Sequence, residues 1–376
     1  MYHFVFYILL AIIVIMGIKL RDLVRNIPID ASELAGSVIS VDAPNIISSL
    51  FSFSHKNSTD SKYFLDGTQR PISHLYGLLY RVNFYYSKRV LPLFCFDGID
   101  SELKKMRTKD RLKDFLFTEK WFQQVLKNGD KNRAREIAMS SEYFWPNIIK
   151  ESKALLGALG VPYIESPASA ESQSAQLVKD GIARYSNSQD YDSLLFGCPR
   201  VIRNLSKSLR RKEQGKWTYT KIQPQLIELK TTLKQLKISV FQLVDMGLLI
   251  GTDYFPGIKE VGPKIALKLI KLNGTIERVI AVEKDKYDFS KLSSRIIKEV
   301  RKIFLFPEVL HEYPSFHWDL PHEESIVSML CRDHRLNEER VKNNIEKTIN
   351  NYNKTIKYSS SHLNEPRKIQ KKLLEY

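Results

Sequence analysis

The sequence predicts an α/β fold, and two observations support this class. Apolar runs that resemble strands alternate with helical segments, and acidic residues lie at or just after the ends of several of these runs. The clearest runs are residues 37–42 and 91–97, each of which ends in an aspartate. In open α/β sheets, ligands bind in the crevice beyond the carboxyl ends of the strands. We therefore expect such carboxylates to converge on one site.

Six carboxylates make up this candidate site, and they come from well-separated parts of the chain: Asp42, Asp97, Glu171, Asp190, Asp192 and Asp253. Taken one at a time, each is also a plausible helix cap or turn residue. Clustered like charges repel one another, so a site built from them is stable only with cations bound. Hard divalent cations such as Mg²⁺ prefer oxygen ligands of this kind. The sequence therefore predicts a metal centre.

The rest of the chain is strongly basic. It has 376 residues, 43% of them hydrophobic, which is enough for one large domain or two lobes. Lysine and arginine number 58 against 42 acidic residues, a formal net charge of +16. A generic soluble surface is one explanation for this excess. An acidic metal centre in a basic protein instead favours metal-assisted cutting of a polyanion, which means nucleic acid.

The cysteines and histidines argue against other classes of metal or disulfide protein. Cys95, Cys198 and Cys331 are far apart, and no CxxC pair occurs, so neither a disulfide framework nor a zinc ribbon is indicated. A reduced, intracellular compartment fits this pattern. The eight histidines form no HExxH motif, which argues against a zinc hydrolase.

The first half of the chain contains several expected helices. Residues 75–90 are apolar at helical spacing, and a charged stretch poor in Gly and Pro follows from 102 to about 135. In that stretch Lys104, Arg107 and Arg111 fall on one helical face. This face is either a solvated helix surface or a basic arch that tracks phosphates. A helix over 142–160, a strand over 161–164 and a helix over 170–180 come next.

The second half begins with a Lys/Arg-rich segment over 206–217 that predicts a hairpin. Residues 234–250 are expected to be one helix. A tight turn and a further helix follow, because Gly262 suits the turn and Pro263 suits a first helical position. Residues 321–349 form another charged helical region, and the polar tail from Ser359 is expected to be mobile.

The amino terminus allows three interpretations. Residues 1–15 are apolar and are followed by Lys19, Arg21 and Arg25. As a secretion signal the segment lacks a basic start and an A-x-A cleavage site. As a membrane anchor it is short, because a span needs about 20 residues. The third interpretation is that translation begins at Met16.

Several motifs in order resemble those of one nuclease family. The strongest are SQDYDSLLFGCPRVIRNLS at 188–206, LLIGTDYFPGIKEVGPKIALKLI at 248–270 and FDG at 96–98, with weaker support from 330–343. From Met16 to about Tyr352 the chain resembles an archaeal-type flap endonuclease of the structure-specific 5′-nuclease family. The resemblance implies a PIN-like nuclease core with a mostly parallel central sheet, a helical arch and a helix–hairpin–helix element. It favours a start at Met16, because Gly17 matches the family's second residue.

The resemblance also assigns roles within the site. It implies two Mg²⁺ ions that are held by the six carboxylates. One ion would generate or orient the attacking water, and both would stabilise charge at the scissile phosphate. Lys104 and Arg111 match catalytic arch residues that reach this phosphate. The residues that match the family's duplex-binding hairpin are Gly257, Ile258, Gly262 and Lys264. In that hairpin a K⁺ ion can bind among backbone carbonyls.

Three positions depart from the family pattern. Ser169 stands where the first glutamate of a Glu-x-Glu pair is usual, and Glu165 lies four residues too early to replace it. Ser48 stands where an aromatic residue stacks on a base, although Phe51 or Phe53 could compensate. Glu260 replaces the first glycine of the hairpin, and a glutamate there is unfavourable near a phosphate unless it points away.

The carboxyl terminus resembles a sliding-clamp binding box. Gln370, Leu373 and Tyr376 match a Gln-x-x-Leu-x-x-aromatic pattern, with one aromatic where two are usual. Short boxes of this kind also occur by chance. A clamp-like partner is therefore an expectation that depends on the family context.

These observations predict the following organisation: an apolar extension (1–15), an N-terminal nuclease region (16–115), the rest of the arch (116–141), an internal nuclease region with the helix–hairpin–helix (142–275), a C-terminal helical region (276–356) and a tail (357–376). The expected function is 5′-flap endonuclease and 5′–3′ exonuclease action in Okazaki fragment maturation and long-patch base excision repair. We expect a cytoplasmic monomer that binds branched DNA and has no membrane partner. The alternatives are a catalytically weakened flap- or clamp-binding protein and a membrane-tethered nuclease.

Overall fold

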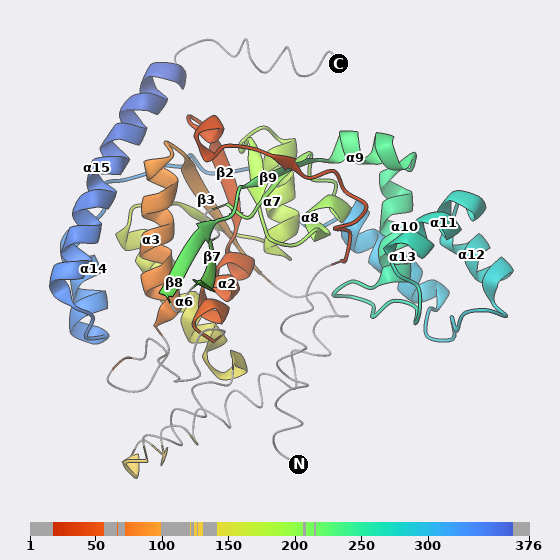
Figure 1. Ribbon diagram of the computed structural model, residues 1–376, viewed down its shortest axis with the longest axis horizontal. Helices are drawn as coiled ribbons and strands as arrows, with labels where there is room; N and C mark the ends of the chain where they lie inside the picture. Colours follow the sequence, from red (N-terminus) through yellow and green to blue (C-terminus); the bar gives the residue numbers. More distant parts are fainter. Residues whose placement is uncertain are drawn as a thin grey trace.

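The computed structural model (Figure 1) describes most of the chain: residues 18–55, 66, 72–98, 121, 124–125, 127–130, 141–205, 208–213 and 216–363. The apolar extension, the arch residues Lys104 and Arg111, and the clamp box at Gln370, Leu373 and Tyr376 lie outside these residues. No helix among the described residues is both long enough and apolar enough to cross a membrane.

A mostly parallel sheet of seven strands forms the centre of the molecule, as the sequence predicts. Its spatial order is β1 (Ile27–Pro28), β9 (Gln225–Glu228), β6 (Arg200–Arg203), β5 (Tyr185–Asn187), β2 (Val38–Asp42), β3 (Leu91–Phe96) and β4 (Tyr163–Glu165). The strands from β6 to β4 are parallel, whereas β9 and β1 are antiparallel to their neighbours. A short 3₁₀ helix, Ala31–Leu34, leads into β2. The order reverses at β2, which pairs with β3 on one side and β5 on the other, and such a switch point is where α/β sheets bind ligands.

Alternating side chains on the buried strands divide the core into two layers. On β3, Phe94 and Phe96 contribute to the layer with α2 (Ala43–His55) and α3 (Ser73–Ser87). Leu93 and Cys95 contribute to the other layer, where α7 (Ala170–Lys179) packs. Both layers are buried because a parallel sheet is covered on both faces. Helix α6 (Ser141–Ala158) lies beside α3 and brings the chain to β4.

A helical lobe lies beside the sheet and consists of α9 (Leu229–Leu236), α10 (Val240–Ile250), α11 (Pro263–Asn273), α12 (Ile276–Glu283) and α13 (Ser294–Leu305) (Figure 1). The expectation of one helix over 234–250 was wrong. Lys237 takes a left-handed conformation, φ +54°, which ends α9. Ser239 and Gln242 then form a capping box that starts α10.

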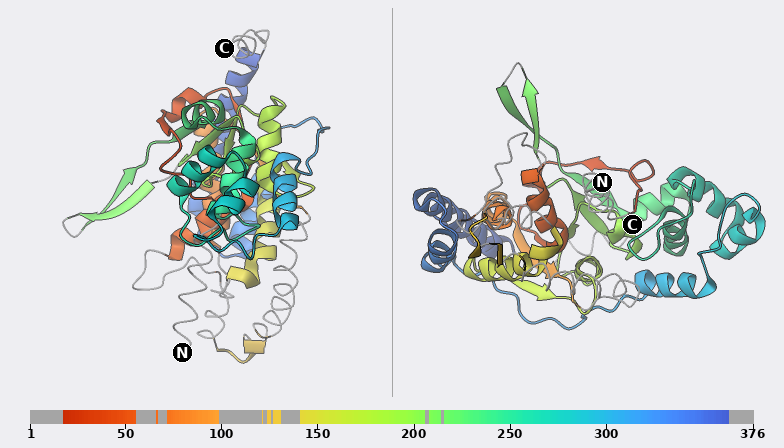
Figure 2. Two further views of the ribbon diagram at one scale, coloured as in Figure 1. Left: turned by 90° about the vertical axis from the view of Figure 1, so that its right-hand side faces the viewer. Right: turned by 90° about the horizontal axis from the view of Figure 1, so that it is seen from below.

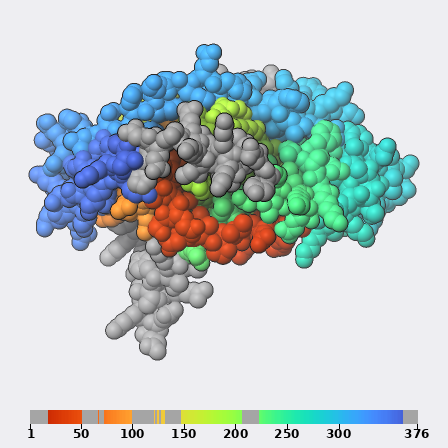
Figure 3. All heavy atoms as spheres, turned by 90° about the horizontal axis from the view of Figure 1, so that it is seen from above, coloured from red at the N-terminus to blue at the C-terminus, as the bar shows by residue number. Residues whose placement is uncertain are grey.

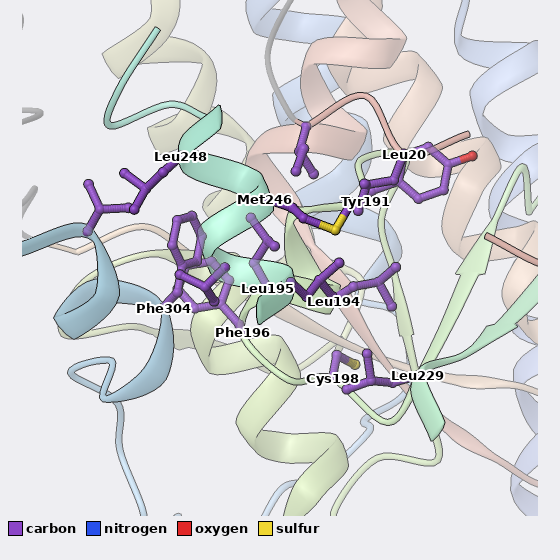
Figure 4. Close-up of a cluster of buried hydrophobic side chains, with 14 of the residues drawn as sticks. Leu20, Tyr191, Leu194, Leu195, Phe196, Cys198, Leu229, Met246, Leu248 and Phe304 are labelled. Atoms are coloured by element: carbon purple, nitrogen blue, oxygen red, sulfur yellow. The ribbon is translucent and has the colours of Figure 1, made fainter. Parts of the chain in front are cut away.

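The helical lobe is joined to the sheet by a buried apolar cluster (Figure 4). Leu194 and Leu195 of α8 (Asp192–Leu195) lie beside Met246 of α10, and the centres of the Phe196 and Phe304 rings lie 4.8 Å apart, with their planes tilted by 52°. The turn before α8 carries the candidate metal ligand Asp190, and α8 itself begins with the candidate ligand Asp192. This cluster therefore fixes the position of that turn relative to the lobe.

An extended segment, residues 306–322, returns from the lobe along the nuclease core (Figure 3). The Gln173 side chain bonds both the N–H and the C=O of Leu310, at 2.7 and 3.1 Å. Further along, the Trp318 indole N–H donates to the carbonyl of Pro92 at 2.7 Å. These contacts hold the segment against α7 and β3, although it has no regular structure of its own.

The described part of the chain ends in α14 (Glu323–Val327), a π-helical turn (Ser328–Asp333) and the long α15 (Glu338–Leu363), which packs on α3. The expectation of a mobile tail from Ser359 was wrong for residues 359–363, which continue this helix. Contacts with the core explain the extra length: the Thr355 hydroxyl donates to the carbonyl of Tyr86, and Arg89 lies 4.7 Å from the centre of the Tyr358 ring.

The Lys/Arg-rich segment is a two-stranded ribbon, as expected. It consists of β7 (Ser208–Glu213) and β8 (Lys216–Lys221), which pair antiparallel. Figure 2 shows this ribbon projecting from the body of the molecule.

Candidate active site

The sheet places Asp42 next to the turn that carries Asp190 and Asp192. Asp42 is the last residue of β2, and the turn follows the neighbouring strand β5, which ends at Asn187. The Ser188 hydroxyl bridges the two segments by donating to Asp42 Oδ2 at 3.0 Å. Asp42 also caps α2, because its Oδ1 accepts the backbone N–H of Asn45 at 3.3 Å. Thus Asp42 both starts a helix and faces the site.

Asp97 follows β3, the strand on the other side of β2. Its Oδ1 accepts the N–H of Ala170, the first residue of α7, at 2.8 Å. The next residue, Gly98, passes so close to another loop that a Cβ there would lie 1.7 Å from the carbonyl oxygen of Ser166. The FDG motif therefore needs glycine for a steric reason, and it brings Asp97 to the start of α7.

Three of the other carboxylates lie at helix ends, which corrects part of our expectation, whereas Asp190 lies in the turn after β5. Glu171 lies in the first turn of α7, and Asp192 is the first residue of α8. Asp253 follows the carboxyl end of α10, where we expected strand ends or the turns after them. The described structure thus uses both strand ends and helix ends to place acidic side chains at the site.

Charge repulsion links each of the six carboxylates to at least one other member of the group. Burial, together with the charges of Asp97 and Asp190, raises the pKa of Asp42 to about 7. Burial likewise raises the pKa of Glu171 well above its usual range, with added repulsion from Asp42, Asp192, Asp190 and Asp253. Charging this cluster therefore costs free energy, which bound cations would offset.

Two neighbours partly relieve this repulsion. Burial and Asp253 raise the pKa of Asp190 to about 6, and the positive charge of Arg203 opposes the rise. Burial and Asp253 also raise the pKa of Asp192, whose Oδ1 accepts the backbone N–H of Ile18 at 2.6 Å. The backbone at Ile18 therefore contacts the site directly.

The donor set has the chemistry that hard divalent cations prefer. All six candidate ligands are carboxylates, the chemistry that Mg²⁺ prefers. Within the described ranges, no three acidic, histidine or cysteine side chains are arranged to hold one ion by themselves. Magnesium ions at phosphate-cutting sites keep several waters and bind through one or two carboxylates plus the substrate's phosphate. The arrangement suits that mode.

The sequence alone did not single out Asn45, Ser188 and Arg203 as site residues. Asn45 donates from its side-chain amide to Asp190 Oδ2, and its Oδ1 accepts the N–H of Gln189 at 2.8 Å. Ser188 and Arg203 lie inside the quoted 188–206 motif, so their presence was visible but their partners were not. Their contacts join residues distant in sequence, and only the fold brings these together.

Ser169, which replaces a usual glutamate, has a structural task. It is the N-cap of α7, and its Oγ accepts the N–H of Ser172 at 3.2 Å. Glu165 does not substitute for the missing carboxylate, since it is exposed and pairs with Lys153 at 2.7 Å. Ser48 lies half-buried in α2, and the side chains of Phe51 and Phe53 lie outside the described structure.

The Ser169→Glu variant is expected to need less Mg²⁺ for half-maximal cleavage, by roughly threefold to tenfold, because an added carboxylate raises the ligand charge. Loss of the serine cap should cost about 1 kcal/mol of stability. A magnesium titration of cleavage, together with thermal unfolding, measures both effects. Ser169→Ala is the matched control, because it loses the cap without gaining a charge. An unchanged magnesium requirement in the glutamate variant would mean that this position does not face the metals.

The helix–hairpin–helix turn is shaped by close backbone contacts. Gly257 has φ +83°, and a Cβ there would lie 2.5 Å from the carbonyl oxygen of Ile250. Ile258 is buried, and its N–H donates to the carbonyl of Leu249 at 2.8 Å. Gly262 is the N-cap of α11 and provides no side-chain cap, while Lys264 is exposed in the first turn. The first N–H groups of α11 can therefore receive a phosphate.

Glu260 occupies a conformation that suits glycine, with φ +68°. Glu260→Gly should stabilise the protein by about 0.5–1 kcal/mol, because glycine enters the left-handed region without steric cost but loses more freedom on folding. Removing the exposed charge should also strengthen duplex DNA binding at low salt. Thermal unfolding and a DNA-binding titration measure these changes. Glu260→Gln should give only the second effect, and unaltered DNA affinity in both variants would place the charge away from the phosphates.

Comparison with known proteins gives consistent results. The XPG I-region family model matches residues 160–253, which include four of the six carboxylates. Flap endonuclease 1 of Methanosarcina acetivorans is 36% identical over 334 residues, covering 88% of this chain and 95% of the relative. The solved structure of flap endonuclease-1 from Methanococcus jannaschii is similar with a TM-score of 0.69 and 28% identity, covering 90% of this chain and 99% of that one. The catalytic core of Rad2 in complex with DNA substrate shares the fold, with a TM-score of 0.59 and 21% identity over 86% and 95% of the two chains.

Proposed function

This chain belongs to the flap endonuclease 1 family, and from that premise we propose that it cuts branched DNA at the base of a 5′ flap. It is a structure-specific nuclease that hydrolyses phosphodiester bonds. The observation that carries the proposal is the position of Asp42, Asp97 and Asp190 after neighbouring strands at the switch point of the sheet, where burial and neighbouring negative charges raise the pKa of Asp42. We place its action, including 5′–3′ exonuclease action, in Okazaki fragment maturation and long-patch base excision repair.

In this proposal the metal ligands are Asp42, Asp97, Glu171, Asp190, Asp192 and Asp253, which together hold two Mg²⁺ ions. When bound, such ions stabilise charge on a phosphate and lower the pKa of a water molecule. The protein's own part is to hold the carboxylates in place. Ser188 and Asn45 fix the oxygens of Asp42 and Asp190, and the Ile18 N–H fixes Asp192.

Recognition of the substrate is proposed to depend on backbone contacts and shape rather than on base edges. The uncapped start of α11, at Gly262, and the exposed Lys264 support a grip on duplex phosphates. A K⁺ ion at the carbonyls of the Gly257–Ile258 turn belongs to the same proposal. Lys104 and Arg111, outside the described residues, would neutralise the scissile phosphate.

The partners that we propose are branched DNA with a 5′ flap and a sliding clamp that binds Gln370, Leu373 and Tyr376. The net charge of +16 favours the first partner by electrostatic attraction. The second rests on the sequence of the tail alone. We propose that the enzyme acts as a monomer.

The departures at Ser169, Ser48 and Glu260 favour one rival, a protein that binds flaps but cuts them poorly. A cleavage assay separates the two functions: protein starting at Met16 is mixed with a labelled double-flap DNA while Mg²⁺ is titrated. Metal-dependent cutting at the flap base is the expected result. Tight flap binding without cutting at any magnesium concentration would favour the binding protein.

A further inference from the structure

Arg203, the last residue of β6, holds the residues on both sides of Asp190. Its Nε and Nη2 donate to the carbonyl oxygen of Gln189 at 2.9 and 2.6 Å. Its guanidinium carbon lies 3.8 Å from the centre of the Tyr191 ring. Because β6 is parallel to β5, its carboxyl end reaches the same edge of the sheet as the acidic turn. The Arg203 side chain thus contacts the Gln189 backbone, just before Asp190, and the Tyr191 ring, just after it.

The opposite side of the same turn is held by Asn45. This residue accepts the Gln189 N–H and donates to the Asp190 carboxylate. The Gln189 side chain in turn accepts the N–H of Asn204 at 3.3 Å. The turn is therefore bonded from α2 on one side and from the end of β6 on the other, which leaves it little freedom to move.

The contacts of Arg203 require the shape of arginine. A planar guanidinium can place two N–H groups on one carbonyl oxygen and stack its face on an aromatic ring at the same time. A lysine ammonium carries the same charge without this geometry. Arg203 is half-buried, and its charge opposes the rise in the pKa of Asp190 that burial causes.

We propose that Arg203 is a positioning residue that sets the turn from Gln189 to Asp192, and through it both aspartates, for divalent cation binding. The proposal rests on the proposed metal-dependent nuclease function. Residues that orient metal ligands typically change metal affinity by about 10- to 100-fold when they are replaced. Arg203 should therefore act on the magnesium requirement without touching the DNA.

The test compares Arg203→Lys and Arg203→Gln with the wild type in two magnesium titrations. One follows cleavage, and the other follows the rise of the thermal unfolding midpoint without DNA. Both variants are expected to need at least about tenfold more Mg²⁺ in both titrations, with the KM for DNA unchanged. The lysine variant keeps the positive charge, so it still tests the proposal if the glutamine variant does not fold.

Arg200 offers a matched control at the other end of β6. Its Nε donates to the carbonyl of Arg184 at 2.9 Å, and its guanidinium carbon lies 5.7 Å from the centre of the Tyr185 ring. Arg200→Lys should leave the magnesium requirement as in the wild type.

Two outcomes would overturn the role of Arg203. One is a lower unfolding midpoint with an unchanged magnesium requirement, which means that Arg203 only stabilises the fold. The other is a raised KM and altered salt dependence with an unchanged magnesium requirement, which means that it contacts DNA phosphates. A wild-type protein that shows no response to Mg²⁺ would instead refute the proposed metal centre itself.

Discussion

Replacing Asp190 with asparagine is expected to lower the rate of flap cleavage by about 10³-fold or more, which corresponds to about 4 kcal/mol of transition-state stabilisation. The change removes one charge from the acidic cluster and keeps the shape of the side chain. Flap binding should be largely retained, because it depends on contacts with the DNA backbone outside the cluster. Single-turnover cleavage and a binding titration on the same double-flap DNA measure the two quantities.

The same variant should gain stability in the absence of divalent cations. Burial of Asp190 and the negative charge of Asp253 raise the pKa of Asp190 to about 6. A neutral asparagine at this position therefore removes an unfavourable buried charge. Its unfolding midpoint should rise, and the further increase on adding Mg²⁺ should shrink. Asp288→Asn is the matched control, since Asp288 is an exposed aspartate in the helical lobe. Normal turnover by Asp190→Asn would refute the assignment of this metal ligand.

Replacing Arg301 with methionine is expected to give the largest loss of stability, about 3–5 kcal/mol, because a buried charge loses its partner. Arg301 of α13 donates from Nε and Nη2 to both oxygens of Asp245 on α10, at 2.7 and 2.8 Å. The Asp245 side chain is fully buried, with 0% exposure. Arg301 also pairs with Glu277 of α12 at 2.6 Å, so one guanidinium joins three helices of the lobe. Chemical denaturation monitored by circular dichroism measures the loss.

A second arginine on the same helix provides the comparison. Arg295 pairs with Glu299 at 2.7 Å, but its side chain is 79% exposed. Arg295→Met should cost no more than about 0.5 kcal/mol, the usual value of a pair one helical turn apart. Adding Asp245→Asn to the Arg301 variant should recover part of its loss by removing the unpaired charge. Equal costs for the two arginines would show that Asp245 does not depend on Arg301.

Much of the fold was open to prediction because its signals are local. The strands ending at Asp42 and Phe96, the helix α3 and the ribbon at 208–221 follow from apolar periodicity and turn composition over a few residues. The errors arose where a single residue decides a boundary. Lys237 breaks a long apolar pattern by taking a left-handed conformation, and contacts of Thr355 and Tyr358 with the core extend a polar helix.

The sequence by itself determined the chemistry of this protein: the acidic residues, the basic charge and the ordered motifs that resemble a flap endonuclease. Only the tertiary structure decided which residues hold the acidic side chains in position. The bonds from Arg203 to Gln189, from Asn45 to Asp190 and from Ile18 to Asp192 join residues that are 14 to 174 positions apart. Such pairings depend on strand order and helix packing, which bring distant segments together. No local pattern along the chain specifies them.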